Sequence, residues 1–312
     1  MPIPRFDVAI VGGGLVGASL AIALDRIGRD VALVEAAPPG ALPAVFDERN
    51  LSFAEATVHG LRALGVLQHL RAPSGAIRRI HVSRSGDFGR VLLDAKDHGR
   101  EQFGQVVVAR DFGEALEARL NECTRVTRFR PMRFEGAHVE GDARVLTLRG
   151  ADGAEQQIAA RLLVGADGTR SGVRDALGIG ADDHDFGQTL FVARVRAERA
   201  PDGTAYERFG PNGPTALLPR GDNFFGVVHG VPRDEADAVA ALDGAAWLAR
   251  LQQAFGWRVG RFLSSGARAT TCTIGYALRA RSSPNARPSS ATRRRRCIRS
   301  AHRGSTSACA MR

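Results

Sequence analysis

Residues 6–35 read FDVAIVGGGLVGASLAIALDRIGRDVALVE, and this stretch decides the fold. The short apolar run at 8–11 is typical of a buried strand, and it ends at three consecutive glycines. The next run places apolar residues at helical spacing, and a second apolar run, at 31–34, ends on Glu35. The pattern therefore predicts a strand, a helix and a second strand, with the glycines at the first turn.

The glycines match the spacing G-x-G-x-x-G of a dinucleotide-binding turn at Gly12, Gly14 and Gly17. The first permits the tight turn, the second lets a pyrophosphate approach the backbone, and the third lets the helix pack closely on the strand. Glu35 follows Gly17 by 18 positions, close to the roughly 20 expected for an acid that binds the adenosine ribose. A carboxylate there favours FAD or NAD over NADP. An ordinary glycine turn is the alternative, but the ordered context favours a dinucleotide.

Length and composition indicate a globular protein. The chain has 312 residues, 44% of them hydrophobic and 24% charged, which suffices for one large or two medium domains. No run approaches the roughly 18 apolar residues of a membrane span, and the N-terminus enters a strand without a signal-peptide segment. We therefore expect a cytoplasmic protein, with a peripheral position on the inner membrane left open.

The net charge of +10 belongs to the end of the chain. Residues 270–312 hold ten of the 43 basic residues and none of the 33 acidic ones, so the preceding part is neutral overall. The four cysteines, which include Cys123, show no C-x-x-C spacing. Neither a zinc site nor a disulfide framework is indicated, and no metal is expected.

Two groups of charged residues are candidate ligand contacts. Asp47 and Arg49 form a D-x-R pair in an expected loop, where a solvated ion pair is the alternative. Arg110 begins a predicted helix, the end at which a cation is unfavourable. It therefore reaches for an anion or is a plain surface arginine.

Asp167 and Gly168 form a third candidate site. They follow an apolar strand at 162–164 and precede a helical pattern. Open α/β sheets bind ligands at the carboxyl ends of their strands, so this pair differs from the other Asp-Gly turns of the chain. A simple turn is the alternative.

The remaining pattern is rich in strands. It predicts a β-hairpin over 77–93, a β-meander over 133–158 and several strands over 186–231. A helix is expected around 245–255, with one face formed by Trp247, Leu251 and Phe255. That face is interpreted as core rather than as a stack on a cofactor.

Four motifs follow one another along the chain: the glycine turn with Glu35, D-E-R at 47–49, Arg110, and GADGTRSGVR at 165–174. Together they resemble the FAD-dependent aromatic hydroxylases of the p-hydroxybenzoate hydroxylase type. Within that group the chain looks most like the ubiquinone-biosynthesis hydroxylases, over about residues 5–268. The resemblance implies an α/β fold, in which a Rossmann-like FAD-binding domain is interleaved with a mixed β-sheet substrate domain.

The resemblance also implies roles for residues. The ADP half of FAD would be held by the glycine turn and Glu35, the flavin side would be lined by two arginines, and the ribityl or pyrophosphate region would be met by an Asp-Gly pair. The cofactor-binding residues so implied are Gly12, Gly14, Gly17, Glu35, Arg49, Arg110, Asp167 and Gly168. The flavin supplies the chemistry, and the sequence offers no Ser/His/Asp cluster, so no catalytic side chain is assigned.

The implied reaction is hydroxylation of an aromatic ring with O2 and with NAD(P)H as reductant. Its substrate would be a small aromatic or prenylated phenol, such as a polyprenyl intermediate of ubiquinone biosynthesis. Association with the membrane surface or with a complex of that pathway is a further expectation, and no nucleic-acid partner is expected. The predicted domains are FAD-binding segments at 1–75 and 106–182, a substrate-domain hairpin at 76–105, the substrate domain at 183–268, and a disordered Arg-rich tail at 269–312.

The resemblance breaks where the group carries a third motif, G-D/N-A-A-x-x-x-H-P-x-x-G-Q-G-x-N, which closes over the flavin. The chain instead continues from about Thr270 into an Arg- and Ser-rich segment without apolar periodicity. Three interpretations stay open: a basic tail that binds nucleic acid, a targeting tail, and translation in the wrong frame. Back-translating residues 289–311 with permitted codons, and reading one base earlier, gives VIGNAAQTLHPIGTSGFNLGLRD. We therefore hypothesise a frame change between about residues 269 and 284.

Two functions of a different class stay open. One is a non-catalytic, FAD-deficient fragment that lacks the third motif, and the other, if the tail is genuine, is a basic-tailed binding protein. Among enzymes, a flavin-dependent prenyl reductase or halogenase is the alternative. A halogenase would show a W-x-W-x-I-P-like motif, and Trp247 and Trp257 are too far apart in sequence to supply it.

Overall fold

The computed structural model describes residues 2–43, 47–266, 269–271, 275–279 and 309–311. The chain divides into two compact units, each assembled from separate stretches of sequence. Unit 1 comprises Met1–Pro43, Leu120–His184 and Gly275–Arg312, and unit 2 comprises Ala44–Arg119 and Asp185–Ile274. The domain limits predicted from the sequence stay predictions. Of the predicted disordered tail, residues 272–274, 280–308 and 312 lie outside the described residues. Its described parts differ from the prediction, because Ala269–Thr271, Gly275–Arg279 and Cys309–Met311 are β-strands.

Unit 1 is built on a seven-stranded sheet of order β8-β2-β1-β11-β10-β9, with β20 paired to β11. Neighbours from β8 to β11 run parallel, whereas β10 and β9 continue the sheet antiparallel. The strands are β1 Arg5–Val11, β2 Val31–Val34, β8 Val126–Phe129, β9 Met132–Glu140, β10 Ala143–Gly150, β11 Glu155–Gly165 and β20 Cys309–Met311. All of β2 and the last four residues of β1 are buried, as expected of parallel strands inside a sheet.

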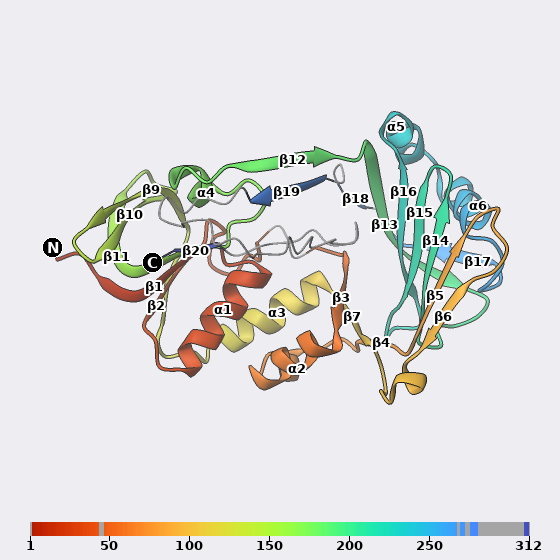
Figure 1. The fold of residues 1–312 in the computed structure, drawn as a ribbon, viewed down its shortest axis with the longest axis horizontal. Coiled ribbons are helices and arrows are strands. Elements are labelled where there is room, and N and C mark those ends of the chain that lie inside the picture. Colours follow the sequence, from red (N-terminus) through yellow and green to blue (C-terminus); the bar gives the residue numbers. More distant parts are fainter. Residues whose placement is uncertain (1, 44–46, 267–268, 272–274, 280–308, 312) are drawn as a thin grey trace, which may run out of the picture. The chain divides into compact units, whose positions relative to one another are not determined.

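Helix α1 (Leu15–Arg26) connects β1 to β2 and packs along them, as Figure 1 shows. Its buried face consists mainly of small residues, among them Gly17, Ala18 and Ala21, which let the helix lie close to the sheet. The predicted unit of strand, helix and strand is thus confirmed. A short helix, α4 (Gly172–Ala176), contacts β9 and β11.

One strand is longer than the sequence indicated. The antiparallel order of β9, β10 and β11 confirms the predicted meander. However, the strand expected at 162–164 is not separate, because β11 runs without interruption over Glu155–Gly165. Its first half pairs with β10 and its second half with β1, so the change of partner, and not a turn, explains the change in hydrophobic pattern.

Unit 2 is built on an eight-stranded sheet of order β17-β13-β16-β15-β14-β5-β6, with β18 paired to β13. Only the β14–β5 pair is parallel. The strands are β5 Arg79–Arg84, β6 Val91–Asp94, β13 Gln188–Ala197, β14 Thr204–Gly210, β15 Gly213–Pro219, β16 Phe225–Pro232, β17 Phe262–Ser265 and β18 Ala269–Thr271. The structure confirms the hairpin predicted at 77–93 and the strands predicted over 186–231.

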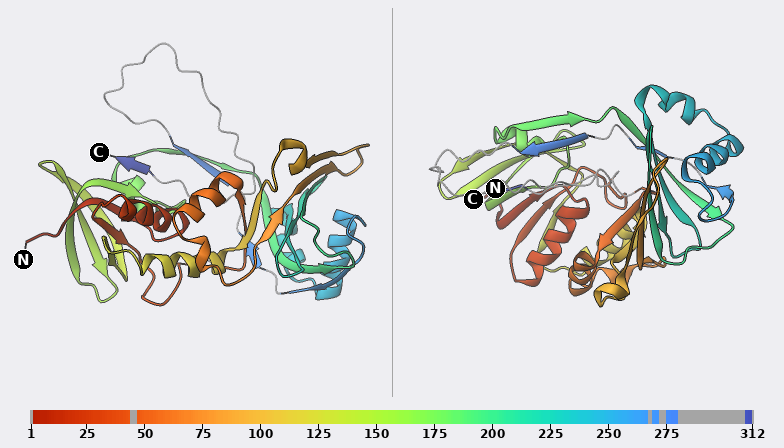
Figure 2. Two further views of the ribbon diagram at one scale, coloured as in Figure 1. Left: turned by 90° about the horizontal axis from the view of Figure 1, so that it is seen from below. Right: turned by 45° about the vertical axis from the view of Figure 1, so that its right-hand side comes forward.

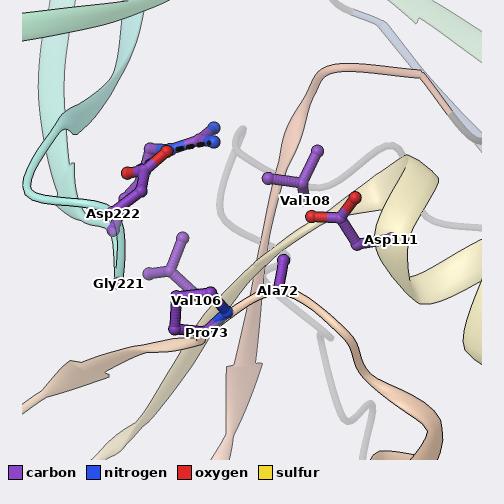
Figure 3. A pocket seen from close by; sticks show the side chains of 8 residues that line it. Ala72, Pro73, Val106, Val108, Asp111, Gly221 and Asp222 are labelled. Carbon is purple, nitrogen blue, oxygen red and sulfur yellow. Dashed lines mark hydrogen bonds and ion pairs between the residues drawn. The ribbon is translucent and has the colours of Figure 1, made fainter.

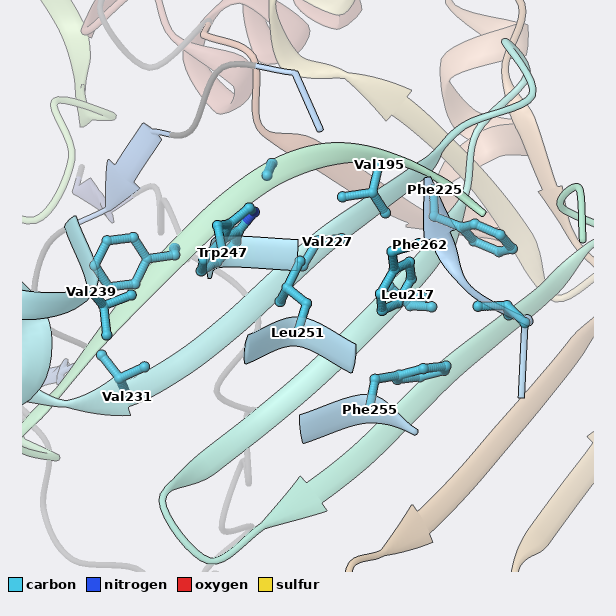
Figure 4. Packing of buried hydrophobic residues seen from close by; sticks show 13 residues of the cluster. Val195, Leu217, Phe225, Val227, Val231, Val239, Trp247, Leu251, Phe255 and Phe262 are labelled. Atoms are coloured by element: carbon cyan, nitrogen blue, oxygen red, sulfur yellow. The ribbon is translucent and has the colours of Figure 1, made fainter. Parts of the chain in front are cut away.

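Helix α6 (Gly244–Phe255) closes the core of unit 2. The Asp243 carboxylate accepts a hydrogen bond of 2.8 Å from the N–H of Ala246 and so caps the helix. Trp247, Leu251 and Phe255 are fully buried, and Figure 4 shows them against the apolar side chains of the sheet. The interpretation of this helix face as core is confirmed.

Smaller elements complete the two units. In unit 2, a three-stranded sheet of order β3-β7-β4 leads into helix α3, and α2 follows β3. The bounds are β3 Asn50–Ala54, α2 Glu55–Ala63, η1 Leu67–His69, β4 Gly75–Ile77, η2 Ala95–His98, β7 Gly104–Val108, α3 Ala109–Leu120, η3 Arg233–Glu235 and α5 Ala236–Ala240. The remaining strands, β12 Ala181–Asp185 and β19 Gly275–Arg279, pair with each other.

Candidate cofactor site

The turn between β1 and α1 has room only for glycine at two positions. Gly12 has φ +105°, and a Cβ there would lie 2.4 Å from the carbonyl oxygen of Ala166, at the end of β11. A Cβ at Gly17 would lie 1.8 Å from the carbonyl oxygen of Gly12. These distances are far below van der Waals contact. The two glycines therefore allow the turn to pass between α1 and the end of β11.

The N-terminus of α1 faces this turn with free hydrogen-bond donors. Gly14 is the N-cap residue, with no side-chain cap, and the first turn of the helix contains no acidic residue. The first helical hydrogen bond runs from the N–H of Ala18 to the carbonyl of Gly14, over 3.0 Å. The N–H groups of residues 15–17 therefore have no acceptor within the helix. The dipole of this 12-residue helix and its N-terminal N–H groups together favour the binding of an anion at this end.

Glu35, directly after β2, is held by two backbone donors. Its Oε2 accepts a hydrogen bond of 2.7 Å from the N–H of Gly13, and its Oε1 accepts one of 2.7 Å from the N–H of Ala37. An ionised carboxylate has about four acceptor sites, so two stay available for hydroxyl groups. The predicted acid thus lies beside the glycine turn in a fixed orientation.

Arg130 orders the loop after Glu35, a role that no pattern in the sequence indicated. Its Nη2 donates to the carbonyls of Pro38 and Ala41 over 2.6 and 2.7 Å, and its Nε donates to that of Ala37 over 3.2 Å. Arg130 follows β8, about 90 positions after this loop. Local spacing could not have revealed this contact, because it depends on the pairing of β8 with β2.

The Asp-Gly pair lies at the end of β11, beside the glycine turn. Asp167 Oδ1 accepts a hydrogen bond of 2.5 Å from Ser171, and Oδ2 accepts one of 3.1 Å from the N–H of Val173. The carboxylate therefore fixes the start of α4, and Gly168 supplies a positive φ of 85°. Five predicted residues thus directly follow the carboxyl ends of β1, β2 and β11, namely Gly12, Gly14, Glu35, Asp167 and Gly168. The sixth, Gly17, lies beside them in the first turn of α1. The chain leaves β1 towards β2 on one side while β11 lies on the other, a switch point of the kind at which α/β sheets bind ligands.

The two predicted arginines belong to unit 2, where they lie at the start of α3. Arg49 Nε lies 2.8 Å from Asp47 Oδ1, and Arg110 forms an ion pair with Glu48. The backbone N–H of Arg110 donates to the Asp47 carbonyl over 2.8 Å. The segment 47–49 therefore covers the N-terminus of α3. The carboxylate of Glu48 offsets the unfavourable interaction between the Arg110 cation and the positive end of the helix dipole. Asp47 and Arg49 thus form a partly buried ion pair, and the role of Arg49 as a ligand contact stays a prediction.

Unit 2 also contains a small cavity of about 30 Å³ with a mixed apolar and charged lining, shown in Figure 3. Asp111 and Asp222 lie on opposite sides of it, and its other lining residues are Ala72, Pro73, Val106, Val108, Arg220 and Gly221. Burial raises the pKa of Asp111, and Glu114 adds to this shift while Arg110 opposes it. The cavity has room for one or two water molecules, far less than the roughly 300 Å³ of a small ligand site.

Arg220 is the cation at this cavity and is almost fully buried. It donates to Asp222 from Nε and Nη2 over 2.9 to 3.2 Å, and to Asn50 Oδ1 over 3.0 Å. Burial alone would raise the pKa of Asp222, but the hydrogen bonds and charge of Arg220 bring that pKa below its usual value. Arg220 thus connects β3 to the turn between β15 and β16.

No group of three or more His, Cys, Asp or Glu side chains within the described part of the chain could hold a metal ion. None of the described helices combines the length and apolar character needed to cross a bilayer.

Comparison with known proteins gave one family and several relatives. The family model for the FAD binding domain matches residues 5–273. The chain is 35% identical over 255 residues to the ubiquinone hydroxylase UbiL of Rhodospirillum rubrum, covering 81% of this chain and 58% of that protein. It is 29% identical over 224 residues to the 3-demethoxyubiquinol 3-hydroxylase of Escherichia coli, covering 71% of this chain and 56% of that protein.

Solved structures share the fold. The p-nitrophenol 4-monooxygenase PnpA of Pseudomonas putida superposes with a TM-score of 0.66, at 18% identity, over 89% of this chain and 69% of that one. At this identity the likeness concerns the fold alone. The chain spans less than two thirds of the length of the relatives it matches by sequence.

Proposed function

This chain belongs to the FAD binding domain family, and from that premise we propose that it carries the cofactor site of a flavin-dependent monooxygenase that hydroxylates an aromatic ring. The observation that carries the proposal is the agreement between the family match and the cradle at the ends of β1, β2 and β11. Relatives named as ubiquinone hydroxylases support a polyprenylated phenol of ubiquinone biosynthesis as substrate.

The residues of unit 1 fit the ADP half of FAD. Gly12 and Gly17 leave the space that a Cβ would fill, and the uncapped N-terminus of α1 would bind the pyrophosphate. Glu35 keeps free acceptor sites for ribose hydroxyls while Gly13 and Ala37 hold its orientation. Arg130 would keep the following loop in place.

Four further residues are proposed for the rest of the cofactor. Arg49 and Arg110 would line the flavin side, and their ion pairs with Asp47 and Glu48 would fix the direction of both guanidiniums. Asp167, with Gly168, would meet the ribityl or pyrophosphate region from the end of β11. FAD, when bound, would supply oxygen activation and transfer, with NAD(P)H as the proposed reductant. The protein's part is to orient the cofactor and to keep water from it.

Position in the cell and partners belong to the same proposal. A polyprenylated substrate resides in the membrane, so we propose a protein that acts at the membrane surface, alone or with other enzymes of the pathway. No helix of the described residues spans the bilayer, so this contact would be peripheral.

A second candidate is a related fragment that has lost the cofactor. The family match ends at residue 273, close to the start of the Arg-rich segment, and that segment lacks the third motif of the resemblance. This candidate shares the ancestry of the first but predicts a colourless protein.

The visible absorption spectrum separates the two candidates. The full chain is incubated with FAD, desalted and scanned against a sample of the same chain with Gly12→Ala. Flavin bands retained by the first sample and lost from the second support the cofactor site, and NAD(P)H oxidation with phenols then tests hydroxylation. A chain that is folded by circular dichroism and retains no flavin contradicts the active-enzyme proposal and favours the fragment.

A further inference from the structure

Strand β6 is the outermost strand of the eight-stranded sheet, and the described residues place no strand on its outer side. Its three apolar side chains are exposed, with accessibilities of 56% for Val91, 48% for Leu92 and 39% for Leu93. Figure 2 shows the β5–β6 hairpin at the margin of this sheet. Edge strands are usually protected from pairing by Lys, Pro or a bulge, and residues 91–94 contain none of these.

The backbone of β6 presents hydrogen-bonding groups on that open side. The N–H of Ala95 donates to the carbonyl of Arg78 over 2.9 Å, so Ala95 and Arg78 form a hydrogen-bonded pair. In an antiparallel ladder, such pairs alternate along the strand with pairs that are not hydrogen-bonded. Given the register, residues 91 and 93 direct their backbone groups to β5, and His81 and Leu92 form a pair without hydrogen bonds. The N–H and C=O of Leu92 therefore point away from β5.

The charges at the two ends of β6 make the strand complementary to itself. Arg90 precedes Leu92 by two positions, and Asp94 follows it by two. When two copies of the strand pair antiparallel with Leu92 facing Leu92, Arg90 of each copy faces Asp94 of the other. Residues 90, 92 and 94 all direct their backbone N–H and C=O groups away from β5, so this register lets those groups form hydrogen bonds with the second copy. Val91 then faces Leu93 of the second copy.

The surroundings of Arg90 favour an additional carboxylate. Arg208 and Arg258 lie nearby, and burial together with repulsion from Arg208 and Arg90 lowers the pKa of Arg258. The side chain of Arg208 donates to the Ala254 carbonyl over 3.2 Å, and that of Arg258 donates to the Phe255 carbonyl over 3.3 Å. These uncharged acceptors leave net positive charge near Arg90, which Asp94 of a second copy would reduce.

We propose that β6 pairs antiparallel with β6 of a second copy of this chain, centred on Leu92, so that the sheet continues across a two-fold axis. A closed two-fold pair uses the same patch on both copies and leaves no open edge at β6. Because so short a strand buries less than the roughly 1,200 Å² of stable interfaces, the dimer is weak and depends on concentration.

Sedimentation velocity of the full chain tests the proposal. We expect a reversible shift from monomer to dimer as the concentration rises to the order of 100 μM. Leu92→Lys, which places a charge at the centre of the pair, should raise the dissociation constant at least about tenfold. Leu263→Lys is the matched control, because Leu263 is similarly exposed on β17, at the other end of the same sheet. A monomer at every concentration, or equal effects of both changes, would overturn the proposal.

A charge exchange tests the register independently of any loss of folding. Arg90→Glu and Asp94→Arg should each weaken the dimer, because each places like charges opposite one another. The double variant restores two opposite-charge pairs and should recover the dissociation constant of the original chain. In addition, Leu92→Cys should form an intermolecular disulfide under mild oxidation in a background where the four native cysteines are replaced by serine, whereas the same background with Leu92 retained should not. If the double variant is no better than the single variants, this register is wrong.

Discussion

The imidazole of His229, on β16, lies 2.9 Å from the hydroxyl of Thr215, on β15, inside the core beneath α6. Arg250 Nε donates to His229 Nε2 over 3.3 Å, so Nε2 is unprotonated and Nδ1 carries the proton that is donated to Thr215. Arg250 is in turn paired with Glu235 over 2.7 Å. Burial, with a smaller contribution from Arg250, lowers the pKa of His229 from 6.5 to about 4.

The first prediction is a loss of stability in mild acid. Between pH 6.5 and about 4, the unfolded chain binds a proton at residue 229 that the folded chain does not. The free energy of unfolding is therefore expected to fall as the pH drops through this window, by about 3 kcal/mol from this group. Above pH 6.5 the contribution is complete.

Urea unfolding at pH 7 and pH 5 measures the effect. His229→Gln should reduce the difference between the two pH values, whereas the same change at His138, an exposed histidine, should leave it unaltered. An unchanged pH dependence in the His229 variant would assign the acid sensitivity to other groups.

The second prediction concerns the close approach at Gly17. Gly17→Ala would place a Cβ 1.8 Å from the Gly12 carbonyl oxygen, so the turn must move and FAD binding should be lost. Gly60→Ala is the matched control, because Gly60 is also helical but a Cβ added there would meet no atom within 4 Å. That change should stabilise the protein by about 0.5 to 1 kcal/mol. Thermal unfolding and flavin absorbance measure both variants, and FAD retention by the Gly17 variant would remove this residue from the site.

The third prediction tests Arg130 as a positioning residue. Arg130→Met removes donors to the carbonyls of Ala37, Pro38 and Ala41, and should cost about 2 kcal/mol of stability. Because the freed loop follows Glu35, the FAD dissociation constant should rise, and amide exchange over 36–43 should accelerate. Arg133→Met, at an exposed position on β9, is the control. Unchanged exchange in the loop would show that Arg130 does not order it.

The sequence could predict what depends on local spacing. The glycines, the strand endings at Glu35 and Gly165, and the helix face at Trp247 all follow from periodicities within a few turns of chain. Arg130 could not be found this way, because its partners are set by β8 pairing with β2. The same holds for β11, whose pattern changes because its neighbour changes from β10 to β1, and for Glu48, whose role depends on the packing of 47–49 on α3.

The fourth prediction concerns the Arg-rich segment, where the family match ends at residue 273. If the frame changes between about residues 269 and 284, a one-base repair of the gene replaces this segment with VIGNAAQTLHPIGTSGFNLGLRD. By resemblance that motif closes over the flavin, so the repaired protein should retain FAD at least about tenfold more tightly than the original chain. Flavin absorbance after desalting measures the difference, with a chain ending at residue 268 as the control. Equal retention by the repaired and the shortened proteins would show that the motif contributes nothing to the site, and a gene sequence that no single frame change restores to the motif would reject the frame hypothesis itself.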